Sequence, residues 1–334
     1  MNLSHPITAE IVIQSNANTP SPPMKNILTI TLNPTVDKST VIDQLVPEKK
    51  LRCDLPKFEP GGGGINVSRG LRRLGIDSTA LYPAGGRTGS LLQDLLSKES
   101  ITQQAVEVSA ETRENFIVVA SSTNQQYRFG MPGSEIPQTE QDKFFEVYAS
   151  LKPFPEIIVI SGSLPPGMPP EFLRKLIIKG KEHGAKIIAD TSEDALMLAI
   201  EEGVFLLKPN LGELERLSGW GTLDIEQADE AALKLIEEGK TEVIVVSLGP
   251  QGAYLITKDI NEHIPAPTVK KLSTVGAGDS MVAGMVSVLA RGGSYQEMVR
   301  MGVACGSAAT MNSGTQLFKQ EDALRLFDRL MSKK

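Results

Sequence analysis

Short runs of apolar, largely β-branched residues recur along the chain and are separated by longer segments with helix-like spacing of apolar residues. The short runs lie at residues 27–32, 157–160, 186–189, 204–207 and 243–247. Apolar runs without polar alternation are typical of strands that are buried on both faces. The helix-like segments lie at residues 69–74, 90–98, 171–180, 226–239 and 280–291. Because strands and helices alternate, we expect an α/β fold with a mostly parallel sheet and right-handed crossovers.

Two stretches follow a different pattern. Residues 39–58 and 115–131 alternate apolar and polar positions and carry charges between the apolar residues. Such alternation is typical of antiparallel strands with one face in water. We therefore expect a small sheet, formed from about residues 39–58 and 113–131, that projects from the main domain and covers a cleft as a lid.

The beginning of the chain differs from the rest. Residues 1–23 are polar and end in a proline-rich segment, which predicts a disordered tail. The first strong strand follows Met24, so we expect residues 24–334 to form a single domain. Residues 1–23 also lack the basic start and apolar centre of a secretion signal, which favours a cytoplasmic protein.

Composition and charge narrow the classes of function. The 334 residues include 34 Lys and Arg against 40 Asp and Glu, a net charge of −6. A mildly acidic chain without a basic block is a poor candidate for nucleic-acid binding, although a local pocket for a small anion remains compatible with it. Two cysteines and three scattered histidines form neither a disulfide framework nor a zinc motif. No apolar stretch approaches the length of a membrane span.

The most informative segment is Ser273-Thr274-Val275-Gly276-Ala277-Gly278-Asp279-Ser280, which precedes an apolar helical run. Small residues at a helix start allow backbone N–H groups to face an anion, and the helix dipole favours negative charge there. Asp279 would then lie in the first turn, where a carboxylate can take a proton from a hydroxyl group. The alternative is that Asp279 only caps the helix.

A second segment contains four consecutive glycines, Gly61 to Gly64, followed by Asn66 at the start of a helix. Glycines leave room for a polar ligand to approach the main chain. The Asn66 amide can offer both a donor and an acceptor to sugar hydroxyls. The alternative is a flexible turn.

Two further segments follow predicted strands directly. Asn210 and Glu213, after the strand at residues 204–207, are three positions apart on a helix and offer hard oxygens to Mg²⁺ or its waters. A capping box fits the same spacing. The glycine-rich segment 247–253 follows the strand at 243–247, where a parallel sheet binds ligands, and it is equally compatible with a plain turn. The chain lacks a P-loop and a complete G-x-G-x-x-G motif.

Taken together, the motifs at residues 33–37, 61–66, 208–213, 247–252 and 274–280 resemble, in this order, the ribokinase/PfkB family of carbohydrate kinases. The resemblance covers nearly all of the chain after Met24. It implies a ribokinase-like three-layer α/β/α fold with a projecting β lid. The segment 33–37, Asn-Pro-Thr-Val-Asp, is similar to the branch of the family that acts on sugar phosphates.

The resemblance implies roles for individual residues. Asp279 would be the general base, with an anion hole formed by Gly276, Ala277 and Gly278. The substrate-binding residues would be Asp37, Lys50, Arg52, Gly62, Gly63, Gly64, Asn66, Arg113 and Ser163. The nucleotide would be bound by Lys208, Asn210, Ser247, Leu248, Gly249, Pro250, Gln251 and Gly252. Asn210 and Glu213 would hold Mg²⁺, partly through water, with Asp190 nearby. A K⁺ ion would be held by main-chain oxygens of Ser273, Val275, Asn312, Gly314 and Gln316.

The activity implied by the resemblance is ATP-dependent phosphorylation of fructose 6-phosphate at its C1 hydroxyl, as in glycolysis, by a homodimer paired through the lid. The four glycines favour this branch over kinases of tagatose 6-phosphate or fructose 1-phosphate. A nucleoside kinase would leave Lys50, Arg52 and Arg113 without an anionic partner. A catalytically inactive sugar-phosphate-binding regulator is the alternative from another class, and Asp279 with the Asn210/Glu213 pair argues against it.

Overall fold

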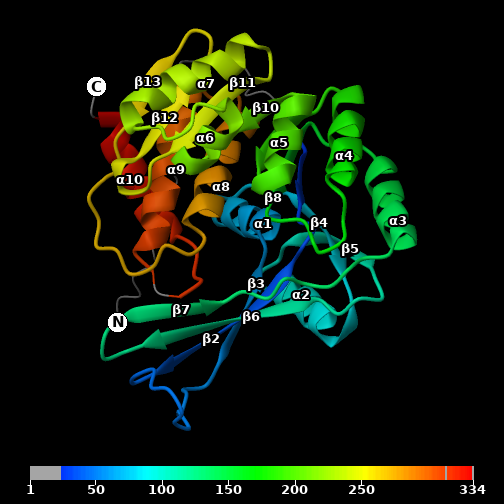
Figure 1. Cartoon of the computed structure of the whole chain (residues 1–334), viewed down its shortest axis with the longest axis vertical. Helices are drawn as coiled ribbons and strands as arrows, with labels where there is room; N and C mark the ends of the chain where they lie inside the picture. The colour runs from blue at the N-terminus through cyan, green and yellow to red at the C-terminus, as the bar shows by residue number, and fades with distance from the viewer. Residues whose placement is uncertain (1–23, 313, 333–334) are drawn as a thin grey trace, which may run out of the picture.

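The larger sheet has its strands in the order β13-β12-β11-β10-β9-β8-β1-β4-β5 (Figure 1). The structure is a computed structural model that describes residues 24–312 and 314–332. From β11 to β5 all neighbouring strands are parallel, and β12 and β13 add an antiparallel edge. The strands are β1 (Ile27–Ile30), β4 (Thr79–Ala84), β5 (Thr102–Glu107), β8 (Ile157–Ser161), β9 (Lys186–Asp190), β10 (Val204–Leu207), β11 (Thr241–Ser247), β12 (Ala253–Ile256) and β13 (Asn261–Ile264).

Helices cover both faces of this sheet. One face packs against α1 (Gly63–Arg73), α8 (Ala277–Ala290), α9 (Tyr295–Thr310) and α10 (Gln320–Ser332). The other packs against α3 (Gln138–Ala149), α4 (Pro170–Glu182), α5 (Glu193–Glu202), α6 (Leu211–Ser218) and α7 (Ala228–Glu237). Within β8, Ile157 and Val159 face the first group while Ile158 and Ile160 face the second. The predicted three-layer α/β/α fold is confirmed.

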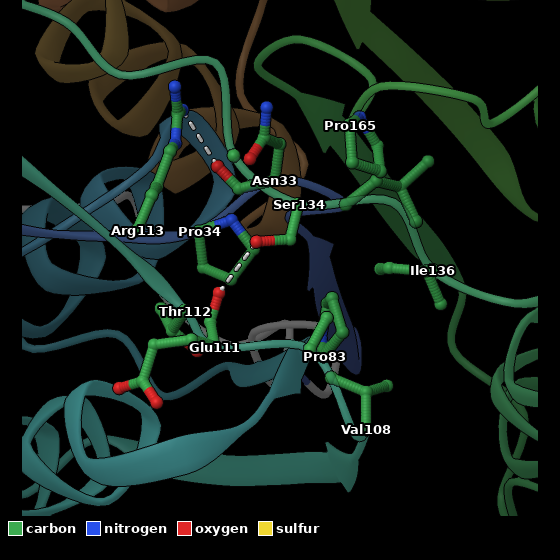
Figure 2. A pocket seen from close by; sticks show the side chains of 13 residues that line it. Asn33, Pro34, Pro83, Val108, Glu111, Thr112, Arg113, Ser134, Ile136 and Pro165 are labelled. Atoms are coloured by element: carbon green, nitrogen blue, oxygen red, sulfur yellow. Dashed lines mark hydrogen bonds between the residues drawn. The ribbon is translucent and has the colours of Figure 1, made fainter.

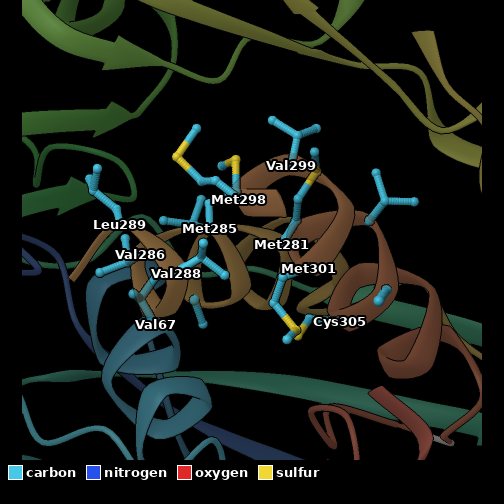
Figure 3. Close-up of a cluster of buried hydrophobic side chains, with 14 of the residues drawn as sticks. Val67, Met281, Met285, Val286, Val288, Leu289, Met298, Val299, Met301 and Cys305 are labelled. Carbon is cyan, nitrogen blue, oxygen red and sulfur yellow. The ribbon is translucent and has the colours of Figure 1, made fainter. Parts of the chain in front are cut away.

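The layer formed by α8 and α9 is the most apolar part of the molecule. All residues of α8 from Ser280 to Ala290 are buried. Figure 3 shows its methionines and valines packed against those of α9 and against Val67 of α1. An α-helix that is apolar on every side is stable only when it is enclosed by protein. This enclosure holds the N-terminus of α8 in a fixed position at the edge of the sheet.

The second, smaller sheet projects from the main domain (Figure 1) and has the order β3-β2-β6-β7. Its strands are β2 (Thr35–Ile42), β3 (Lys57–Gly61), β6 (Arg113–Ala120) and β7 (Gln125–Phe129). We call this sheet, with the loop 43–56, the lid. The expectation of antiparallel strands holds for the two outer pairs and is wrong for the central pair, since β2 and β6 run parallel. Parallel pairing requires a long crossover, which here passes through α1, β4, α2 (Gly86–Lys98) and β5.

The remaining expectations at this level concern the tail and the membrane. The predicted disorder of residues 1–23 falls outside the described residues. Within residues 24–312 and 314–332, no helix is both long enough and apolar enough to cross a membrane.

Candidate active site

The residues singled out from the sequence converge at the carboxyl edge of the larger sheet, where ligands bind in open α/β folds. Asp190 ends β9, Lys208 follows β10, and Ser247 ends β11. The N-termini of α1 and α8 meet at the same edge, and the two helices pack together. The lid adjoins this region through β3, which leads directly into α1.

The N-terminus of α8 carries the central pair of the site. Gly276 adopts a left-handed conformation with φ of 69° and precedes the helix, and no side chain caps the first turn. The Asp279 side chain instead accepts a hydrogen bond from Asn66 Nδ2 of α1, with 2.9 Å between Nδ2 and Oδ2. The alternative that Asp279 only caps its own helix is therefore wrong. The backbone N–H groups of this turn have no side-chain cap and are oriented to favour an anion.

The environment of Asp279 makes it a better base than an ordinary carboxylate. Asp279 is partly buried, and desolvation, with the nearby Asp190 carboxylate, raises its pKa from 3.8 to about 6. The Asn66 hydrogen bond and the Lys208 ammonium oppose that shift. A carboxylate with a pKa near 6 is ionised at pH 7 and still accepts a proton readily.

Lys208 is a buried cation beside this carboxylate. Its Nζ lies 3.0 Å from Oδ1 of Asp190, and the side chain is only 8% exposed. Burial alone would lower the pKa of Lys208, but the carboxylates of Asp190, Glu213 and Asp279 outweigh it and raise the pKa. Lys208 therefore stays charged at neutral pH and offers a fixed positive charge next to the start of α8.

The four glycines allow the N-terminus of α1 to approach the sheet closely. A Cβ on Gly63 would lie 2.2 Å from Ser161 Oγ, and one on Gly64 would lie 2.5 Å from the Ile30 carbonyl oxygen. Gly62 has a φ of 110°, which side-chain-bearing residues rarely adopt. The segment is not a flexible turn, because these contacts pin it between β1 and β8. The glycines are required by the protein's own packing, whatever ligand also uses their backbone.

Asp37 and Arg113 lie on the adjacent lid strands β2 and β6. Asn115 Nδ2 donates to Asp37 Oδ1 at 3.0 Å. Arg113 donates from Nη2 to the Asn33 carbonyl at 2.9 Å and from Nη1 to the Met131 carbonyl at 2.6 Å. Figure 2 shows Arg113 with Asn33 at the pocket between the lid and β1.

Arg113 has unused capacity for an anion. Its Nε is buried and has no hydrogen-bond partner among the described residues. Desolvation lowers the pKa of the guanidinium, and the Asp37 carboxylate partly offsets this. Ser163, also predicted to contact the substrate phosphate, lies near the same pocket, 3.4 Å from Asn33 Nδ2. A phosphate group is the kind of ligand that a buried guanidinium recognises best.

Two of the predicted substrate residues are not brought to this site within one chain. Lys50 and Arg52 lie in the exposed loop 43–56, which points away from the main domain in Figure 1. Neither side chain makes a hydrogen bond or ion pair with residues 24–312 or 314–332. Their role as phosphate ligands stays a prediction.

Asn210 and Glu213 form the capping box of α6. Asn210 Oδ1 accepts from the Glu213 N–H at 3.0 Å, and Glu213 Oε2 accepts from the Asn210 N–H at 2.9 Å. Glu213 Oε1 and Asp190 Oδ2 are not used in the capping box or in the pair with Lys208, and a Mg²⁺ site would rest on them. Within residues 24–312 and 314–332, no group of three or more His, Cys, Asp or Glu side chains could hold a metal ion. Mg²⁺ is typically held by one or two carboxylates, waters and substrate phosphates.

The segment after β11 is ordered by its own contacts. The Ser247 N–H donates to the Pro209 carbonyl at 2.8 Å, which joins the ends of β10 and β11. Gly252 has a φ of 97°, and a Cβ there would lie 2.0 Å from the Ile264 carbonyl oxygen. This packing explains Gly252 without a ligand. The nucleotide roles of Leu248, Gly249, Pro250, Gln251 and Gly252 stay predictions.

The two loops predicted to hold K⁺ lie side by side. Ser273 Oγ donates to the Gly314 carbonyl at 2.8 Å, and the Ser273 N–H donates to the Thr310 carbonyl at 3.3 Å. The predicted ligands Val275, Asn312 and Gln316 are on the same two loops. The Ser273 hydrogen bonds bring the two segments together, and the K⁺ site itself stays a prediction.

Two residues that support the site were missed from the sequence. Asn115 supports Asp37, and its position in an alternating strand was the only signal available. Arg69 lies three residues after Asn66 on α1 and donates to its amide oxygen. Arginine in a helix is usually solvated, so only the spacing from Asn66 pointed to a shared face.

The site thus combines the uncapped N-terminus of α8, the Asp279 carboxylate and the buried Lys208 at one edge of an α/β sheet. The chain matches the pfkB family of carbohydrate kinases over residues 26–322, and it belongs to this family. It is 43% identical to ATP-dependent 6-phosphofructokinase isozyme 2 of Escherichia coli over 309 residues, which is 91% of this chain and 98% of that protein. It is 34% identical to 1-phosphofructokinase of Bacillus subtilis, over 88% of this chain and 96% of that protein.

A solved structure extends the likeness to three dimensions. The crystal structure of phosphofructokinase-2 from Escherichia coli in complex with fructose-6-phosphate matches with a TM-score of 0.87 and 41% identity. The match covers 92% of this chain and all of that one, 100%. The resemblance noted in the sequence is thereby confirmed at the level of family and fold.

Proposed function

We propose that this protein is an ATP-dependent 6-phosphofructokinase, which transfers the terminal phosphoryl group of ATP to the C1 hydroxyl of fructose 6-phosphate. The observation that carries this proposal is the Asp279 carboxylate in the uncapped first turn of α8, hydrogen-bonded to Asn66. The greater identity to a 6-phosphofructokinase, 43% against 34% for a 1-phosphofructokinase, supports the choice of substrate.

In this mechanism, the oxygen of the C1 hydroxyl attacks the terminal phosphorus atom of ATP, and Asp279 receives the proton of that hydroxyl. The new bond joins C1 oxygen to phosphorus, and the bond between phosphorus and the β–γ bridging oxygen breaks, releasing ADP. The negative charge of the transferred phosphoryl group is stabilised by the backbone N–H groups of Gly276, Ala277 and Gly278 and by the α8 dipole. Transfer of a phosphoryl group depends mainly on such positioning and charge stabilisation.

The sugar phosphate is bound between the lid and the main domain. Asp37, Asn66 and the backbone of Gly62, Gly63 and Gly64 orient the sugar hydroxyls, while Arg113 and Ser163 bind the existing phosphate. The support is the common placement of Asp37 and Arg113 on paired lid strands, with a buried Arg113 Nε that lacks a partner in the described chain. Closure of the lid would exclude water and limit hydrolysis of ATP.

The nucleotide is bound by Lys208, Asn210 and the segment 247–252. Asn210 and Glu213 would hold Mg²⁺, partly through water and with Asp190 nearby, and that ion would neutralise charge on the nucleotide phosphates when bound. K⁺, held by main-chain oxygens of the loops at 273–275 and 312–316, is a second proposed ion.

We further propose a homodimer formed through the lid, acting in the cytoplasm. The lid exposes several large apolar side chains: Val41, Leu45, Leu55, Phe58 and Phe129. Phe58 and Phe129 lie on the same face of the sheet, which a second lid would cover. Contiguous exposed apolar surface is typical of protein interfaces. Because loop 43–56 points away from its own site, Lys50 and Arg52 would reach a substrate phosphate only in the partner's site.

The experiment is a coupled assay of ADP release with Mg-ATP and four separate acceptors: fructose 6-phosphate, tagatose 6-phosphate, fructose 1-phosphate and fructose. We expect a preference for fructose 6-phosphate of at least tenfold in kcat/KM, with fructose the poorest substrate. Preference for another phosphosugar would retain the mechanism and overturn the assigned substrate. If ATP binds and no acceptor is turned over, the inactive regulator is the better interpretation.

A further inference from the structure

Arg69 is a buried cation that lies behind the site rather than in it. It is on α1, and its side chain is only 2% exposed. Its Nε and Nη2 donate to the two carboxylate oxygens of Glu99 at 2.8 and 2.7 Å. Glu99 follows the last turn of α2, so this bidentate pair joins two helices. Burial of a guanidinium is costly, and pairing its donors in this way offsets much of that cost.

The third nitrogen of the guanidinium points toward the site. Arg69 Nη1 donates to the Pro60 carbonyl at 2.9 Å and to Asn66 Oδ1 at 3.1 Å. The other end of the same amide, Asn66 Nδ2, donates to Asp279 Oδ2 at 2.9 Å. A continuous chain of hydrogen bonds therefore runs from Glu99 through Arg69 and Asn66 to Asp279.

An asparagine amide has an acceptor at one end and donors at the other. If Asn66 turned over, its carbonyl oxygen would face the Asp279 carboxylate and repel it, and its NH₂ group would face the Arg69 guanidinium. A donor fixed at Oδ1 allows only the orientation in which the NH₂ group faces Asp279. The fork of Arg69 can hold Glu99 and Asn66 together, which the single ammonium of a lysine cannot do.

We propose that Arg69 is a positioning residue of the phosphoryl-transfer site, which fixes the Asn66 amide so that its NH₂ group holds the Asp279 carboxylate in place. Arg69 itself touches neither substrate nor nucleotide. The inference rests on the proposed function of Asp279. The donated hydrogen bond also lowers the pKa of Asp279, against desolvation. The charged groups that face Asp279 are Asp190 from β9, Lys208 after β10 and Asp37 from the lid.

The test compares Arg69→Lys with Arg69→Met across a pH series of kcat from pH 5 to 9. The lysine side chain keeps a buried positive charge beside Glu99, but it cannot also donate a hydrogen bond to Asn66 Oδ1. If Arg69 positions Asn66, Arg69→Lys will melt within a few degrees of wild type, yet kcat at pH 7 will fall about tenfold. The acidic limb of its pH profile will move up by about one unit, because Asp279 loses a stabilising donor. Arg69→Met should show at least the same shift.

Arg73→Lys is the matched control, since Arg73 lies on the same helix and donates to the Phe318 carbonyl instead. We expect its pH profile to match the wild-type profile. If Arg69→Lys keeps both the stability and the pH profile of the wild type, Arg69 only anchors α1 to α2 and the inference is wrong. If Arg69→Met does not fold, the Lys variant alone decides. A wild-type enzyme inactive on every acceptor would count against the proposed function, whereas an active one with an unchanged Arg69→Lys profile counts only against this inference.

Discussion

The two sheets differ in how completely their faces are covered. In the larger sheet, β8 and β10 are buried along their whole length, between helices on both faces. In the lid, β7 has no buried residue, and β2 and β3 expose apolar side chains such as Val41 and Phe58. The larger sheet is a complete core, whereas the lid leaves apolar side chains exposed. Phe58 and Phe129 lie with Lys38 on one face of the lid, which we call the open face, and Val41 lies with Asp37 on the opposite face.

The candidate catalytic and substrate-binding side chains are divided between the same two regions, the larger sheet with its helices and the lid. Asp279, Lys208 and Asp190 extend from the larger sheet and the helices packed on it, where enclosure fixes their geometry. Asp37 and Arg113 extend from the lid, which projects from that body. Under the function proposed above, the enclosed part would perform the transfer and the lid would select and enclose the substrate. Substitutions in the two regions should therefore fail in different ways.

The largest effect is expected from Asp279→Ala. Loss of a general base typically costs about 10²–10⁴-fold in rate, so kcat should fall by that factor. Binding of fructose 6-phosphate should survive, because Arg113 and Asp37 are intact. Calorimetric titration of the sugar phosphate and a thermal melt separate this result from unfolding. Parallel loss of binding, turnover and melting temperature would assign Asp279 a structural role instead.

The next effect contrasts the two sheets in stability. Leu206 of β10 is fully buried, and Leu206→Ala should lower the free energy of unfolding by about 2–5 kcal/mol. Val41→Ala, at a 38% exposed position of the lid, should cost about 0.5 kcal/mol or less. Urea unfolding of both variants measures this ratio. Equal costs would mean that the Val41 side chain is covered in solution.

Arg113→Gln tests the lid as the region of substrate selection. Removal of a charged donor to a phosphate should raise KM for fructose 6-phosphate about 10- to 100-fold, with a smaller change in kcat. Turnover of unphosphorylated fructose is the internal control and should change little. If both acceptors lose the same factor, the guanidinium supports the lid through the Asn33 and Met131 carbonyls and does not bind phosphate.

The sequence was most informative where local pattern and tertiary packing agree. Continuous apolar runs predicted the strands of the larger sheet, because burial on both faces leaves no alternation. The parallel pairing of β2 with β6 was missed, since it depends on a crossover of some 70 residues and not on either strand's pattern. Alternation predicts a wet face, and it does not predict the direction of a partner.

The same distinction applies to the site. Asp279 and the glycines were found because a helix start with small residues is a local signal. Asn210 and Glu213 fitted both a capping box and a metal site, and the hydrogen bonds show the capping box. Arg69 was missed because its burial depends on Glu99, 30 residues away on another helix. Contacts of this kind become visible only when the elements are packed.

A smaller effect concerns the free energy of unfolding, because the raised pKa of Asp279 makes its ionised form costly in the folded chain. The pKa of Asp279 is raised from 3.8 to about 6 in the folded chain, chiefly by desolvation, so the folded state binds the proton more tightly. Below about pH 4 the carboxyl is protonated in both states and costs nothing. As pH rises through 6, the folded protein loses stability relative to a neutral residue. Asp279→Asn should thus be about 1–3 kcal/mol more stable than wild type at pH 8 and equal to it near pH 4. Urea unfolding at the two pH values measures the difference, and a pH-independent difference would contradict the raised pKa.

The smallest effect on unfolding, and the sharpest test of the open face, comes from Leu55→Ser combined with Phe129→Ser. Leu55 is 91% exposed and Phe129 is 44% exposed, with Phe129 stacked on Phe116 at 6.2 Å. Within one chain these changes should cost about 1 kcal/mol or less. If two lids cover each other, the same changes remove apolar contacts from both partners, and sedimentation should show a shift from dimer to monomer at micromolar concentration. Ile178→Ser, an exposed position of α4 far from the lid, is the matched control. A dimer that persists in the double variant would mean that another surface holds the subunits together, and the lid's apolar face would then need a different explanation.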